Sequence, residues 1–196
     1  MKTIGLTGSF GTGKTFAASV FRRLGADVID ADRIAHRALK KGSPAYKKTV
    51  RLFGKEILGR NGDIDRKRLA GIVFGNPGKL ALLNRIVHPV VTSRIKERIS
   101  AGKRIKVIDA PLLIEARLTG LVDMLIVVKA SRKAQIERCA KKFGMTETEI
   151  TKRIRSQMPL QRKIEMADLV IDNSGTRSET RKQIMKLWRK VRKVWR

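Results

Sequence analysis

The sequence Gly8-Ser9-Phe10-Gly11-Thr12-Gly13-Lys14-Thr15 is the feature that most limits what this chain can fold into. It satisfies the phosphate-binding pattern G-x-x-x-x-G-K-[ST] at every position, between a short apolar segment, 2–7, and a helical pattern, 14–24. Glycines allow backbone angles that turn successive N–H groups onto a phosphate, and the helix N-terminus adds the positive end of its dipole. This context argues against a chance match, so the sequence predicts a nucleoside triphosphate site.

The residue types in this loop suit separate tasks. Lys14 is expected to reach the β- and γ-phosphates, and the Thr15 hydroxyl is expected to bind Mg²⁺. The loop residues that we expect to contact the nucleotide are Gly8, Gly11, Thr12, Gly13, Lys14, Thr15 and Phe16. The motif is strong evidence for a triphosphate ligand and leaves the acceptor of any phosphoryl group open.

Apolar segments alternate with helical patterns along the rest of the chain. Besides 2–7, strands are expected at residues 28–29, 105–108, 124–128 and 169–171. Helices are expected at 14–24, 133–143 and 176–196, and the region from 33 to about 100 is helical and basic. Ser131, and Thr146 with Glu149 three residues later, are helix-capping signals. This order predicts an α/β fold of the P-loop NTPase class, with a five-stranded parallel sheet flanked by helices.

Aspartates follow two of the predicted strands. Asp109 ends an apolar strand as a Walker-B aspartate would, and we expect it to support Mg²⁺ through a water molecule. The alternative is an ordinary aspartate that caps the next turn. Asp30 and Asp32 leave the second strand at the sheet edge where ligands bind. Either can accept a proton from an attacking hydroxyl and either can cap the next helix, so the spacing leaves the choice of base open.

Basic residues are in large excess. The chain has 45 Lys and Arg against 17 Asp and Glu, a formal net charge of +28. Such a charge favours association with polyanions, and the alternative is a merely solvated surface. Five cations follow the fourth strand, where small-molecule kinases have a closing lid: Arg138, Lys142, Arg153, Arg155 and Arg162. Arginine matches phosphate oxygens well, although a solvated basic helix is again the alternative.

Composition and chain length narrow the remaining classes. The single cysteine, Cys139, cannot form an internal disulfide, which indicates a reducing, cytoplasmic compartment. No apolar run approaches the ~18–20 residues of a membrane-spanning helix, and the N-terminus has no secretory pattern. At 196 residues without a long linker, we expect a single domain, 1–196.

Further motifs extend over nearly the whole chain up to about residue 175, and together they resemble the dephospho-CoA kinases. The resemblance rests on GADVIDAD at 25–32, GSPA at 42–45, GDIDR at 62–66, VF at 73–74, HP at 88–89, DAPLLIE at 109–115, Arg153-Ile154 with Gln157, and ADLVIDNSG at 167–175. It implies transfer of the γ-phosphoryl group from ATP·Mg²⁺ to the ribose 3′-hydroxyl of dephospho-CoA, giving CoA and ADP.

The resemblance also implies an architecture and residue roles. It implies a nucleoside-monophosphate-kinase-like core, a helical acceptor-binding insertion at about 33–100 and a lid at about 139–165. The tail after Arg177 has no family signature, and there the residue pattern itself predicts a basic C-terminal helix at about 177–196. It makes Asp32 the general base, and it adds Arg138 and Asn173 to the nucleotide contacts. The acceptor-side residues are His88, Pro111, Leu112 and Glu115, with His88 shaping the pocket wall rather than acting as a base. We expect a monomer.

Some residues depart from the family pattern. Ser9-Phe10 replaces a Gly-aliphatic pair, Phe16 replaces a small hydroxyl residue, and Lys142 replaces an arginine. These departures put the rate of turnover in doubt more than the type of reaction.

The alternatives to a dephospho-CoA kinase are another small-molecule P-loop kinase and a polyanion-binding P-loop ATPase. The terminal helix carries apolar residues at helical spacing, so we expect it to dock on the sheet; the alternative is a membrane- or polynucleotide-binding helix.

Overall fold

The computed structural model describes residues 2–73 and 75–195. Phe74 of the motif set and Arg196 at the expected end of the last helix lie outside the described residues. The chain divides into two compact units, one made of Met1–Asp30 with Ile99–Arg196 and the other of Ala31–Arg98. The boundary after Asp30 separates the P-loop from the helical region that the resemblance assigns to acceptor binding.

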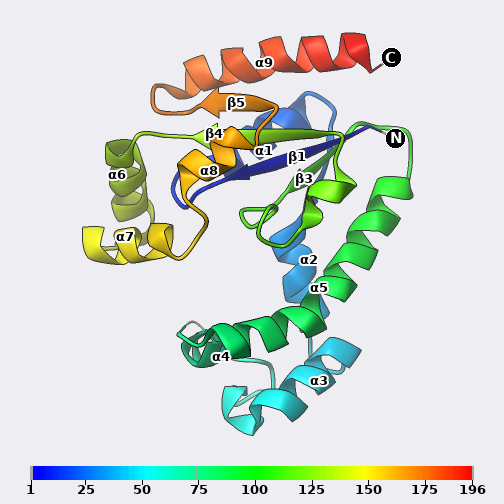
Figure 1. Cartoon of the computed structure of the whole chain (residues 1–196), viewed down its shortest axis with the longest axis vertical. Coiled ribbons are helices and arrows are strands. Elements are labelled where there is room, and N and C mark those ends of the chain that lie inside the picture. The colour runs from blue at the N-terminus through cyan, green and yellow to red at the C-terminus, as the bar shows by residue number, and fades with distance from the viewer. Residues whose placement is uncertain (1, 74, 196) are drawn as a thin grey trace. The chain divides into compact units, whose positions relative to one another are not determined.

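The first unit is built on one five-stranded sheet (Figure 1). Its strands are β1 (Thr3–Gly8), β2 (Asp27–Asp30), β3 (Lys106–Asp109), β4 (Met124–Lys129) and β5 (Leu169–Asp172), in the order β2-β3-β1-β4-β5. Every neighbouring pair is parallel, which confirms the predicted sheet. Because the strands are parallel, the loops that follow all five leave from the same edge.

Helices of the first unit follow the strands in sequence. They are α1 (Lys14–Arg23), α6 (Arg132–Phe143), α7 (Glu147–Arg155), α8 (Leu160–Glu165) and α9 (Arg177–Val194), with a short 3₁₀ turn at Leu118–Leu121. The predicted caps are confirmed: Ser131 accepts from the amide of Ala134 at 3.3 Å, and Thr146 and Glu149 form a capping box. A second capping box, which the sequence analysis did not name, starts α9 at Thr176.

Side chains of β1 alternate between two packed faces. Ile4 and Leu6 are fully buried in a cluster with residues of α1 and α9. Gly5 faces the other side, where a Cβ would stand 2.9 Å from Leu113 Cδ1 and 3.2 Å from Val122 Cγ1. The loop after β3 therefore packs directly on the central strand, and the sheet is covered on both faces as predicted.

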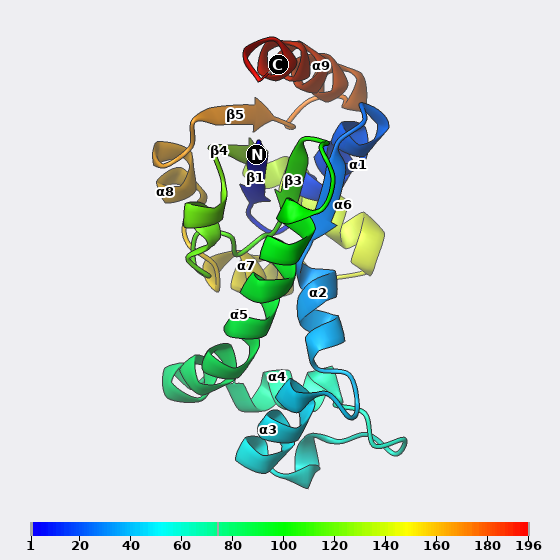
Figure 2. The ribbon, with the colours of Figure 1, turned by 90° about the vertical axis from the view of Figure 1, so that its right-hand side faces the viewer.

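The second unit is helical. It contains α2 (Ala31–Ala38), α3 (Pro44–Phe53), a 3₁₀ turn (Lys55–Ile57), α4 (Arg66–Val73) and most of α5 (Pro77–Ser100). Phe53, Ile57, Leu69 and Val73 form a buried cluster of its own, and α3 and α4 both contact the 3₁₀ turn (Figure 2). No helix of the described chain is long and apolar enough to cross a membrane.

Helix α9 docks on the sheet, which confirms the preferred reading of the terminal helix. It contacts α1 and β5 (Figure 2), and Ile184, Trp188 and Val191 are buried in the main core. Trp188 is 5% exposed and makes an edge-to-face contact with Phe21, with ring centroids 5.8 Å apart. Trp195 is only half-buried because it lies beyond the last turn of the helix. The exposed face of α9 is basic.

Truncation at Arg181 should lower the melting temperature. The same burial predicts that Trp188→Ala alone costs about 3–5 kcal/mol, a shift on the order of 10 °C for a chain of this size. The matched control replaces the exposed cations Lys186, Arg189 and Lys190 by glutamine and should leave melting nearly unchanged. Unchanged melting of the truncated chain, with loss of salt-dependent binding to RNA or anionic liposomes, would contradict the docked role.

Candidate active site

The P-loop joins β1 to α1 through two left-handed glycines. Gly11 has φ 80° and Gly13 has φ 83°, a backbone region that residues with a Cβ rarely adopt. Space is also lacking: a Cβ on Gly13 would stand 2.0 Å from Asn173 Nδ2, and one on Gly11 would stand 2.7 Å from Cys139 Sγ. The loop is closed internally by Thr12, whose hydroxyl donates to the Ser9 carbonyl at 2.9 Å. The loop backbone is therefore shaped before any nucleotide binds.

Asn173 holds this loop from outside. It follows β5, is 4% exposed, and donates from Nδ2 to the Thr12 carbonyl at 2.7 Å. Its Oδ1 accepts from the Thr180 hydroxyl of α9 at 2.8 Å. Sequence reasoning assigned Asn173 a nucleotide contact. In the structure both polar atoms of its side chain are engaged in tying the P-loop to the C-terminal helix, a long-range role that no local motif reveals.

Lys14 forms an ion pair with Asp109. Asp109 is the last residue of β3, which lies between β1 and β2 in the sheet. The register partners of Asp109 are Leu6 of β1 and Asp30 of β2. Both side chains of the pair are largely buried. The structure thus brings the predicted P-loop lysine and the predicted Walker-B aspartate together at the carboxyl edge of the sheet. A cation in this position can exchange its carboxylate partner for the oxygens of a triphosphate.

The two aspartates of the D-A-D segment belong to different elements. Asp30 is the last residue of β2 and is exposed, in register with Asp109. Asp32 lies in the first turn of α2, at the start of the second unit. Because α2 begins at Ala31, Asp32 lies inside the first turn and is not the N-cap residue, a position that falls on Asp30. The helix dipole still favours a carboxylate at Asp32.

The five predicted lid cations do not share one set of partners. Arg138 lies against the loop: its Nη2 donates to the Gly175 carbonyl at 3.4 Å, and its Nη1 is buried without a hydrogen-bond partner among the described residues. Arg153 lies over the ring of Phe10 at 5.3 Å. The other three make different contacts: Lys142 lies over Phe143, Arg162 pairs with Glu165 on its own helix, and Arg155 lines a surface pocket of about 450 Å³ along α7.

Phe16, expected beside the nucleotide, lies at the end of the P-loop in the first turn of α1. Its ring is half-buried and faces Arg177 of α9, whose guanidinium carbon is 5.5 Å from the ring centroid. The aromatic residue that replaces a small hydroxyl residue here thus supplies a contact to the C-terminal helix.

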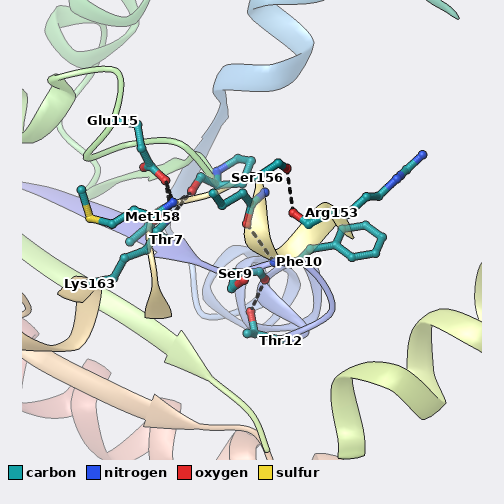
Figure 3. Close-up of polar contacts among 11 residues, drawn as sticks. Thr7, Ser9, Phe10, Thr12, Glu115, Arg153, Ser156, Met158 and Lys163 are labelled. Carbon is teal, nitrogen blue, oxygen red and sulfur yellow. Dashed lines mark hydrogen bonds and ion pairs between the residues drawn. The ribbon is translucent and has the colours of Figure 1, made fainter. Parts of the chain in front are cut away.

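The loop after β3 is anchored by a buried lysine (Figure 3). Lys163 of α8 has a fully buried side chain and donates to the Pro111 carbonyl at 2.7 Å, which also accepts from the Thr7 hydroxyl at 3.0 Å. The same Nζ pairs with Glu115 Oε1 at 2.8 Å, and the Met158 amide donates to this oxygen as well. Sequence reasoning missed Lys163, because nothing in the sequence separates it from the many solvated lysines of this basic chain.

The acceptor-side residues Leu112, Glu115 and His88 have different surroundings. Leu112 is 45% exposed, whereas the neighbouring Leu113 is fully buried. Glu115 Oε2 is buried and has no hydrogen-bond partner among the described residues. His88 lies in α5 before Pro89, and burial lowers the pKa of its imidazole below the usual value. His88 is therefore neutral at pH 7, which suits a pocket wall.

The fold and the loop define a class before any family is considered. The central strand of the parallel sheet leads through G-x-x-x-x-G-K-T into a helix, and the lysine of this motif pairs with the Walker-B aspartate Asp109. This is the arrangement of P-loop kinases. Shikimate kinase from Bacteroides thetaiotaomicron has the same fold, with a TM-score of 0.57 over 97% of this chain and 98% of that chain at 11% identity.

Sequence comparison narrows the class to one family. A family model described as dephospho-CoA kinase matches residues 2–179. The dephospho-CoA kinase of Carboxydothermus hydrogenoformans is 46% identical over 95% of this chain and 93% of the relative, and that of Bacillus cereus is 44% identical over 94% and 96%. A Thermus thermophilus protein of known crystal structure is 31% identical, with a TM-score of 0.86 over 95% of both chains. The chain belongs to the dephospho-CoA kinase family and is a phosphotransferase of the last step of coenzyme A biosynthesis.

Proposed function

We propose that this chain transfers the γ-phosphoryl group of Mg²⁺-bound ATP to the ribose 3′-hydroxyl of dephospho-CoA. The hydroxyl oxygen forms the new bond to phosphorus, the bond from the β–γ bridging oxygen to the γ-phosphorus breaks, the hydroxyl proton goes to a carboxylate, and ADP leaves. The observation that carries the proposal is the preformed P-loop with Lys14 paired to Asp109 at the strand edge, in a chain of this family.

Lys14 is the first catalytic residue of the proposal. When a triphosphate enters the loop, Lys14 leaves Asp109 for the β- and γ-phosphate oxygens and stabilises the charge that moves onto the bridging oxygen. Amides from Gly11 to Thr15 cradle the β-phosphate, and the buried, unpartnered Nη1 of Arg138 beside Gly13 supplies a further donor. Asn173 contributes by fixing the Thr12 carbonyl.

The residues present suit a magnesium ion. Mg²⁺ prefers oxygen ligands, and it is usually held by one or two protein oxygens together with substrate phosphates and water. Thr15 offers an exposed hydroxyl at the start of α1, and Asp109 offers a carboxylate at the end of β3 that would act through water. The bound ion would neutralise charge on the β- and γ-phosphates.

Asp32 is the proposed general base. The support is its match to the second aspartate of the D-A-D segment and its position in the chain, two residues past the end of β2. A positioned carboxylate can accept the proton of the 3′-hydroxyl as the oxygen attacks. Asp30 then has a supporting role at the end of β2.

The proposed acceptor contacts are His88, Pro111, Leu112 and Glu115. Lys163 and Met158 fix one oxygen of Glu115 and leave Oε2 for an acceptor hydroxyl or amide. The exposed Leu112 offers apolar surface to the acceptor, and neutral His88 offers a wall without charge.

The direct experiment is a coupled ADP-release assay with dephospho-CoA, adenosine, AMP or buffer as acceptor. We expect turnover with dephospho-CoA and a phosphorylated product that matches CoA. Preference for AMP or adenosine would favour another small-molecule kinase. ADP release without a phosphorylated acceptor, stimulated by polynucleotide, would favour a polyanion-binding ATPase.

We further propose a cytoplasmic monomer that associates weakly with polyanions. The buried, unpaired Cys139, whose thiol pKa is raised by burial, supports a reducing compartment. The exposed cations of α9 and the net charge of +28 support the polyanion contact, which should weaken steeply with salt.

A further inference from the structure

Phe10, the third residue of the P-loop, is bound through its ring and its backbone to the lid segment, defined here as residues 139–165. Its ring stacks on Phe143 at 5.9 Å with an interplanar angle of 23°, and the guanidinium carbon of Arg153 lies 5.3 Å from its ring centroid. Its amide donates to Gln157 Oε1 at 3.0 Å (Figure 3). One loop residue therefore contacts the end of α6, the last turns of α7 and the turn that follows.

Arg153 contacts the Phe10 ring, and it also interacts electrostatically with Glu149, one turn earlier in α7. Its side chain is exposed, and no acidic group among the described residues pairs with it within ion-pair distance. A guanidinium that stacks on an aromatic face uses its flat side, so the N–H groups in its plane remain available as donors. The contact places the guanidinium carbon over the Phe10 ring, and its N–H groups can still bind phosphate oxygens.

The contacts around Phe10 also restrict how the ring can move. Phe143 stacks on the ring, and the hydrogen bond to Gln157 fixes the backbone from which it projects. The Ser156 hydroxyl donates to the Arg153 carbonyl at 2.8 Å, which tightens the end of α7 that carries the arginine (Figure 3). A leucine at position 10 would keep the amide bond and much of the apolar volume but would lose the π face.

We infer that Phe10 is a positioning residue that holds Arg153 beside the P-loop, where its guanidinium meets the phosphoryl group being transferred. The inference rests on the proposed function, because it requires a triphosphate in the loop. Its physical basis is that an arginine already ordered on the loop loses less conformational freedom when it binds developing charge.

The test is a double-mutant cycle of Phe10→Leu and Arg153→Gln, with kcat and the KM for ATP measured at saturating dephospho-CoA. A cation–π contact of this kind predicts that Phe10→Leu lowers kcat by about 3- to 30-fold. We expect the KM for ATP to stay within about twofold. Phe10→Tyr should restore kcat, and the double variant should be no slower than Arg153→Gln alone.

A second readout uses the ligand-free protein. Amide hydrogen exchange in α7 should be faster in Phe10→Leu than in the unsubstituted chain and should return to normal in Phe10→Tyr. Additive losses of kcat, a faster Phe10→Leu enzyme, or unchanged exchange would each overturn the inference. An unsubstituted chain that fails to phosphorylate dephospho-CoA would instead overturn the proposed function, and with it this role of Phe10.

Discussion

Asp32→Asn should lower kcat by about 10²–10⁴-fold, the range for loss of a positioned general base. Asparagine keeps the size and position of the side chain but cannot accept the proton of the 3′-hydroxyl. The KM for ATP should change little, because the P-loop contacts are made by other residues. The measurement is steady-state kinetics with ATP and dephospho-CoA varied in turn, together with the melting temperature of each variant.

Asp30→Asn is the matched control. It removes one carboxylate from the end of β2, two residues earlier in the same segment, and should affect chemistry less than Asp32→Asn does. If the two variants exchange these phenotypes, the base is Asp30. Equal and small effects from both would exclude the D-A-D segment from proton transfer.

Lys14→Ala should lower kcat by at least ~10²-fold, because a preorganised cation at the β- and γ-phosphates is lost. The change also leaves Asp109 without its ion-pair partner Lys14. We therefore expect a change in the melting temperature in the absence of nucleotide. Near-normal turnover by Lys14→Ala would contradict the assigned role of the P-loop.

Lys106 provides a control for the loss of a buried lysine–aspartate pair. It lies at the start of β3 and pairs with Asp27 at 2.8 Å, at the opposite end of the strand from Asp109. Lys106→Met should lower stability and leave kcat of the folded protein close to normal. A kcat loss as large as that of Lys14→Ala would indicate that the Lys14 effect is structural.

Local sequence patterns predicted much of the fold. The features that they predicted each depend on neighbours along the chain. They are the strand-loop-helix context of Gly8–Thr15, the capping signals at Ser131 and Thr146, and the apolar spacing of Ile184, Trp188 and Val191. The expected strands were each confirmed, with small shifts at their ends. The shifts arise because the end of a strand depends on where the neighbouring strand stops pairing with it, which an apolar run alone does not show.

The parts that sequence could not predict depend on contacts between distant residues. Asn173 was expected at the nucleotide, but its partner is the Thr12 carbonyl, a backbone atom that no motif specifies. Lys163 and Glu115 are separated along the chain and meet only because α8 packs near β4. The sequence marked Phe10 as unusual, but only the structure reveals that its ring meets Arg153 and Phe143.

The hydrogen bond from Asn173 to Thr12 spans 161 residues and has a consequence for biosynthesis. The phosphate loop is translated 161 residues before Asn173, which supports it from outside. At about 5–20 residues per second, the loop waits roughly 10–30 s for that support. In the first half of this interval β1 also lacks its neighbours β3 and β4, which are translated later in it. Nascent chains should therefore acquire affinity for ATP only after β5 and α9 have emerged.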